Sequence, residues 1–216
     1  MKIFDMNSSF YKFGTLIFDL MVLNLLFILS TAIGFGFTFG VSFIAMIYTI
    51  YESIRKDQGR LLYHFVKSIK TNLKQGILLS IMISALSLSA TLVIKNISIF
   101  EKHSTLILII QYILLFETSI ISLYLFPMLA KIQMNSKEAI VNSFFLAHRH
   151  LLTSISCLSR IILNYYIIKY ISPVFIVLSF GGTGYIIERL ILENIIIEKY
   201  VSKELKEELK ISNHFD

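Results

Sequence analysis

The sequence contains no tryptophan, one cysteine, two prolines and only 16% charged residues among its 216 positions. The single cysteine, Cys157, excludes an internal disulfide and any metal site built from several cysteines,. Soluble domains have about 25% charged residues, so the shortage of charge argues against that class. A Gly-Lys-Ser/Thr phosphate loop, HExxH and GxSxG are also missing,. We therefore expect a protein that is not an enzyme and holds no cofactor or metal.

Hydrophobic residues make up 56% of the chain, and the mean hydropathy is +0.73. Residues 16–54 form one nearly unbroken apolar stretch. As a single helix this stretch would be about 58 Å long, whereas the hydrocarbon core of a membrane is only about 30 Å thick. The chain must therefore reverse within it, and the glycines of GFGFTFG (34–40) mark the place for a turn,.

Further apolar runs follow, so the sequence predicts an all-α, polytopic transmembrane bundle of about six spans in a single domain, 1–216. Five spans would also fit, because glycines and charges interrupt the last run, and whether 174–197 crosses fully is left open. The expected spans are 16–33, 37–54, 76–95, 105–129, 151–168 and 174–197, followed by a charged tail, 198–216,.

Lysine and arginine mark the side of the membrane on which each loop lies. With six spans, both termini and the basic loops near 55–74 and 131–149 share one side, whereas the other side holds only Lys95, Lys102 and Lys169. This bias predicts that both termini are cytoplasmic. Attraction to anionic lipid headgroups explains the basic loops beside the spans, so we expect no nucleic-acid partner.

Two predicted cytoplasmic segments, 61–76 and 135–151, carry apolar residues at helical spacing,. This pattern predicts two short amphipathic helices on the membrane surface. Asn135 with Glu138 three residues later favours a capped helix start,. We take Phe65, Lys70 and Phe144 as candidate residues for docking a partner.

Among the polar residues inside the predicted spans, we take Asn24, Glu117 and Arg160 as candidates for a functional or structural role. Such groups usually face the bundle interior, a partner or a water-filled cavity. We interpret Asn24 as a hydrogen-bonding contact between helices, with a substrate-binding amide as the alternative. Glu117 and Arg160 lie near the middle of their spans, so we predict a buried ion pair. This pair would fix helix packing or, alternatively, line a substrate or proton path.

Several motifs occur in order along the chain: VLNLLFIL (22–29), the glycine-rich turn followed by Ala45 and Tyr48, IRKDQG (54–59), FVKSIKTNLKQG (65–76) and YLFPMLAK (124–131). In these motifs the chain resembles the YesL-like family of bacterial integral membrane proteins, whose domain is of unknown function. It departs from the family by lacking a proline near Ser42 and a tryptophan near the end of the first motif.

The resemblance implies a bacterial cell-membrane protein that is an adjunct to carbohydrate uptake or its regulation. Its partners would be the lipid bilayer and an ATP-driven sugar transporter or a regulatory membrane protein. The alternative is a small transporter or permease-like subunit with a polar path through the bundle. The ligand, the partner and the oligomeric state do not follow from the sequence.

Overall fold

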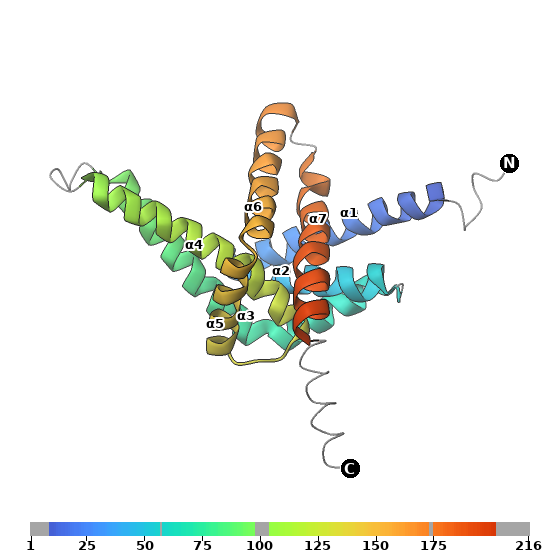
Figure 1. Cartoon of the computed structure of the whole chain (residues 1–216). Coiled ribbons are helices and arrows are strands. Elements are labelled where there is room, and N and C mark those ends of the chain that lie inside the picture. Colours follow the sequence, from blue (N-terminus) through green and yellow to red (C-terminus); the bar gives the residue numbers. More distant parts are fainter. Residues whose placement is uncertain (1–8, 57, 98–103, 173–174, 202–216) are drawn as a thin grey trace, which may run out of the picture.

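The computed structural model describes residues 9–56, 58–97, 104–172 and 175–201, and every regular element in this part of the chain is a helix. In chain order these elements are α1 (Ser9–Ile33), α2 (Phe39–Thr49) with its π-helical continuation η1 (Ile50–Arg55), α3 (Leu61–Lys95), α4 (Ser104–Lys131), α5 (Ser136–Arg149), α6 (Leu151–Tyr166) with η3 (Ile167–Ile171), and α7 (Ile176–Ile187) with η5 (Glu188–Val201). Figure 1 shows the α3–α4 and α6–α7 pairs leaving a common centre in different directions.

The predicted turn between the first two helices is confirmed. α1 ends at Ile33 and α2 begins at Phe39. Gly36 has a φ of +85°, a left-handed conformation that glycine adopts at little cost, and its N–H donates to the carbonyl of Thr31 at 2.9 Å,. The chain therefore reverses within the predicted glycine-rich segment.

α2 is the central helix of the bundle. Most of its residues are buried, and it contacts α1, α3, α4 and α7. Its side chains belong to both hydrophobic clusters, with Ile44 and Ile47 in one and Ala45 and Met46 in the other. This burial on every side explains why its apolar run shows no polar face.

The prediction of a separate surface helix at 61–76 is wrong. α3 runs without a break from Leu61 to Lys95, which corresponds to about 52 Å,. Its first half buries His64, Phe65 and Ser68 inside the protein. Of the apolar residues in this segment, Phe65 is buried in the bundle, whereas Leu62, Val66 and Leu73 are exposed.

The second amphipathic helix does form, as α5. Its capping box is present, and the backbone N–H of Asn135 donates to Glu138 Oε2 at 3.3 Å. α5 packs along the second half of α4 and buries Ala139, Ser143 and Leu146. The prediction of a helix is confirmed, but the buried face of α5 packs against protein and not against the membrane surface.

Glycines do not interrupt α7, although the sequence suggested that they would. A Cβ atom added to Gly181 would lie 2.4 Å from the carbonyl oxygen of Leu20 in α1. Glycine at this position therefore permits close approach of the two helices, as small residues do between membrane helices.

Four described helices are long and apolar enough to cross a membrane: Phe10–Ile33, Leu61–Lys95, Thr105–Lys131 and Leu151–Ile171. α2 with η1 covers only residues 39–55, and η5 carries Glu188, Arg189 and Glu193. Six spans therefore remain a prediction. The part of the predicted charged tail beyond Val201 lies outside the described residues.

Candidate functional site

Six charged side chains gather where η1 ends, α4 ends and η5 begins. We call this group the charged cluster; it comprises Glu52, Arg55, Lys56, Lys131, Glu188 and Glu193. Three carboxylates face three cations, so the formal charges balance. The cluster connects three helical rods: α2 with η1, α4, and α7 with η5.

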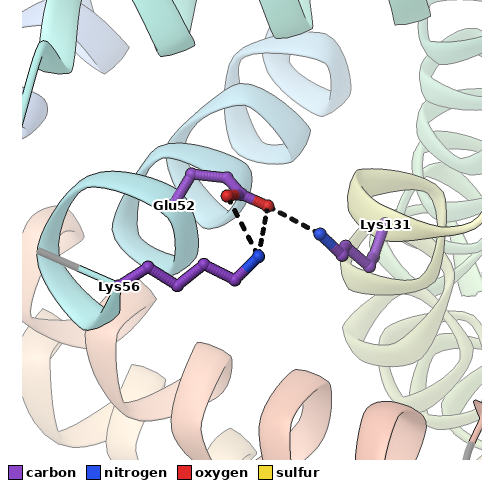
Figure 2. Close-up of polar contacts among 3 residues, drawn as sticks. All are labelled: Glu52, Lys56 and Lys131. Atoms are coloured by element: carbon purple, nitrogen blue, oxygen red, sulfur yellow. Dashed lines mark hydrogen bonds and ion pairs between the residues drawn. The ribbon is translucent and has the colours of Figure 1, made fainter. Parts of the chain in front are cut away.

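Glu52 bridges two of these rods (Figure 2). Its carboxylate accepts a hydrogen bond from Lys131 Nζ at 2.6 Å and another from Lys56 Nζ at 3.2 Å. Its side chain is only 9% exposed, so the carboxylate depends on these two cations for its stabilisation,. Both ammonium groups also lie 4.8 Å from the centre of the Tyr51 ring. Opposite charge and an aromatic face therefore hold the end of α4 against η1.

The pKa of Lys56 reflects this arrangement. Partial burial lowers the pKa of its ammonium group, but the hydrogen bond to Glu52 and the charge of that carboxylate outweigh the effect. The resulting pKa is above the ordinary value for lysine. Lys56 therefore stays charged over the physiological pH range and continues to face Glu52.

Arg55 connects η1 to η5. Its Nε donates to Glu188 Oε2 at 3.1 Å and lies 3.7 Å from Glu193 Oε2, while its guanidinium lies 4.6 Å from the centre of the Tyr185 ring. The side chain of Glu188 is fully buried. Removal of Arg55 would deprive that buried carboxylate of the cation that is hydrogen-bonded to it, which is costly,.

Asn24 joins α1 to α7 by hydrogen bonds. Its Nδ2 donates to the carbonyl of Ile176 at 2.8 Å, and its Oδ1 accepts from the backbone N–H groups of Phe180 and Gly181 at 3.1 and 3.2 Å. The residue is 2% exposed. These contacts agree with the interpretation of Asn24 as a polar contact between helices and leave little of the amide free for a substrate.

The predicted ion pair between Glu117 and Arg160 does not form. Glu117 Oε1 lies 3.3 Å from His148 Nε2, and Arg160 is exposed on α6. Depth along the two helices suggested the pair, but the direction in which each side chain leaves its helix decides the contact. His148, at the end of α5, reaches Glu117 because α5 runs back along α4.

An apolar cavity of about 290 Å³ lies between α1, α2, α4, α6 and α7. Phe27, Phe43 and Phe126 contribute aromatic walls, and Ile187 lines the cavity just before Glu188 of the charged cluster. The side chains with polar groups that line it are Ser122, Asn164, Tyr165, Ser179 and Thr183. Of the predicted path residues Asn24, Glu117 and Arg160, none lines this cavity.

The three predicted docking residues differ in accessibility. Phe65 is 2% exposed and packs in the core with Leu23 and Met46, so its prediction as a docking residue is wrong. Lys70 is exposed on α3, and Phe144 is exposed on α5. Only these two are available to a partner in this structure.

Sequence reasoning missed the charged cluster. Glu52 and Lys56 are spaced by four, which signals a local helical pair. Lys131, however, is 79 positions from Glu52, and no local pattern indicates their contact. His148 was also missed, because its segment was expected to lie on the membrane surface. Among the described residues, no group of three or more His, Cys, Asp or Glu side chains is arranged as a metal site would require.

Residues 20–93 match a family model described as "Protein of unknown function, DUF624". The match covers α2 and most of α1 and α3, including Asn24 and the Glu52–Lys56 part of the charged cluster. It spans about a third of the chain and does not itself assign an activity. No curated protein and no solved structure shows a significant match.

Proposed function

We propose that this chain is a six-span, YesL-like bacterial membrane protein with both termini in the cytoplasm. The helix ends support this arrangement, because η1 and α4 end at the charged cluster and α7 reaches it at Ile187 before the chain continues as η5. The basic residues Lys67, Lys70 and Lys74 lie at the same end of the bundle, on the first half of α3. An excess of cations at one end is typical of the cytoplasmic side.

Within this topology, we infer that the protein is a non-enzymatic adjunct that docks a partner membrane protein. The observation that carries this proposal is the exposed apolar ridge on α5, formed by Val141, Phe144 and Phe145. All three are exposed, and Phe145 reaches 64%. α5 has only 14 residues, about 21 Å, and is too short to span the membrane,. Exposed aromatic side chains on a short helix mark an interaction surface.

The charged cluster supports docking by making the platform rigid. Its ion pairs hold η1, α4 and η5 together, and α5 follows α4 after a four-residue connection. A fixed helix loses less conformational freedom on binding than a mobile one, so more of the contact energy appears as affinity.

Affinity purification from native membranes tests this proposal. The wild-type chain, Phe145→Asp and Tyr63→Asp would be compared by quantitative mass spectrometry. Tyr63 is a matched control because it is an exposed aromatic residue on α3. We expect one membrane protein to co-purify with the wild-type chain and with Tyr63→Asp but not with Phe145→Asp. The same set of proteins with all three chains would contradict docking through α5.

The link with carbohydrate uptake rests on the family resemblance alone. It predicts that the protein lost from Phe145→Asp is a subunit of an ATP-driven sugar transporter or one of its regulators. Identification of that protein in the same experiment tests this part, and a partner from an unrelated process would contradict it.

The alternative function is that of a small transporter, and the apolar cavity favours it. The cavity lies beside the charged cluster, which would close one end of a path. Flux of a sugar or an ion into liposomes that contain only this protein would support the alternative. The cavity's aromatic and aliphatic walls make it a poor match for a sugar, so the adjunct proposal explains more of the structure.

A further inference from the structure

A second cavity, of about 270 Å³, lies between α2, the first half of α3 and the end of α4. We call it the polar pocket; the side chains that define it are Tyr48, Lys67, Thr71, Asn72, Lys131 and Gln133. It is separate from the apolar cavity and from the exposed ridge on α5. The proposed docking function does not use it.

The walls of the polar pocket are rich in hydrogen-bond donors. Lys67 and Lys131 bring two ammonium groups, and no carboxylate is among the lining residues. Lys131 gives one hydrogen bond to Glu52, which leaves further N–H donors on the same ammonium,. Lys67 and Thr71 are four residues apart on α3, so they lie on the same face of the helix,.

Several of these donors have no partner in the part of the chain that the structure describes. The hydroxyl of Tyr48, the ammonium of Lys67 and the side-chain amide of Gln133 make no hydrogen bond there, although Lys67 lies 6.0 Å from the centre of the Tyr63 ring. A concave site with cationic and neutral donors and no lining carboxylate is complementary to a compact oxyanion.

We propose that the polar pocket binds a phosphate group. Lys67 and Lys131 supply the charge, and Tyr48 and Gln133 supply neutral donors. Thr71 also lines the pocket, but its hydroxyl donates to the carbonyl of Lys67 at 3.0 Å. The group belongs either to an anionic lipid headgroup or to a soluble phosphate ester. Basic pockets between membrane helices on the cytoplasmic side are known to bind lipid headgroups, and in the proposed topology the polar pocket opens near that leaflet.

Native mass spectrometry of the full-length protein in detergent micelles tests the proposal and distinguishes the two sources. Dioctanoyl-phosphatidylglycerol is the anionic lipid probe, and dioctanoyl-phosphatidylcholine is its zwitterionic control. Glycerol 3-phosphate and inorganic phosphate are the soluble probes. Lys67→Gln removes a cation from the pocket, and Lys70→Gln removes an exposed cation from the same helix outside it.

We expect Lys67→Gln to weaken phosphatidylglycerol binding by at least about tenfold, because a hydrogen bond to a charged group is lost. Lys70→Gln should bind as wild type does, and phosphatidylcholine should bind weakly. If glycerol 3-phosphate or inorganic phosphate bound to wild type and Lys70→Gln but much more weakly to Lys67→Gln, and no lipid bound, the result would support the site with a soluble ligand.

Equal losses in Lys67→Gln and Lys70→Gln would overturn the proposal, since they would indicate only a diffuse basic surface. Absence of binding by all four probes would also overturn it. Tyr48→Phe keeps the charge and removes a hydroxyl donor from the pocket, so it remains informative if Lys67→Gln fails to fold. If a folded Tyr48→Phe variant bound the phosphate probes as tightly as wild type does, that result would count against the site.

Discussion

The contact between Glu52 and Lys131 gives the sharpest prediction about stability. A double-mutant cycle of Glu52→Gln, Lys131→Met and the combined variant measures the coupling of the two side chains. A second cycle, of Glu52→Gln with Lys56→Met, is the matched control, because Lys56 contacts the same carboxylate. The two cycles therefore differ in which cation is removed.

The structure sets the expected magnitudes. Opposite charges about 4 Å apart attract by about 4 kcal/mol at an effective dielectric constant near 20. Lys131 Nζ lies 2.6 Å from Glu52 Oε1, but its side chain is 31% exposed, so solvent screens part of this energy,. Hydrogen bonds to charged groups contribute about 1.5–3 kcal/mol. We expect a coupling of about 2 kcal/mol between Glu52 and Lys131, lying within that range.

The control pair should be much weaker. Lys56 is on the same helical rod, four residues from Glu52, and its side chain is 39% exposed. Exposed pairs at this spacing contribute about 0.3–0.5 kcal/mol. Titration with sodium dodecyl sulfate in mixed micelles, followed by circular dichroism, gives the free energies of unfolding. A coupling for Lys131 no larger than that for Lys56 would refute the role assigned to the charged cluster.

Three further predictions concern the helix contacts. Asn24→Leu should lower the free energy of unfolding by about 1 kcal/mol in the same titration, because interhelical hydrogen bonds in membranes contribute about this much. An unchanged free energy of unfolding would contradict the contact with α7. Gly181→Leu should destabilise the bundle strongly, because its Cβ atom would clash with α1. Gly182→Leu should be tolerated, because no atom lies near the position of its Cβ. Equal losses of stability in the two variants would contradict the close approach of α7 to α1. The pKa of His148 is raised above 6.5 by its hydrogen bond to the Phe144 carbonyl and by the charge of the Glu117 carboxylate, despite partial desolvation. His148 should therefore stabilise the fold below about pH 6.5 and lose that contribution as the pH rises through its raised pKa. The difference in stability between wild type and His148→Gln across this range, expected to be below about 1 kcal/mol for a part-exposed pair, measures the effect, and a difference that grows with pH would contradict it.

The turn and the helical elements followed from local chemistry. Glycines at 34–40 allow the reversal, and the length of the apolar run requires one,. The capping box of α5 depends only on Asn135 and Glu138. Such features lie within a few residues of one another, so the sequence contains the information needed to predict them.

The contacts between distant segments did not follow from local patterns. Depth along a span predicted Glu117 opposite Arg160, but depth does not specify the side of the helix from which a residue projects. The periodicity at 61–76 does not specify which apolar residues contact protein, because protein and lipid both accept an apolar face. On α3 Phe65 is buried, whereas Leu62 and Val66 are exposed. For the same reason the sequence predicted Phe65 as a residue that docks a partner, although Phe65 belongs to the core.

Site-specific photocrosslinking on α5 tests the central functional claim most directly. Benzoyl-phenylalanine would replace Phe145, which is exposed, and in a separate chain Ala139, which is buried on the same helix. After irradiation of native membranes, we expect a covalent adduct with one membrane protein from position 145 and none from position 139. Adducts with lipid alone from position 145 would contradict docking through this ridge.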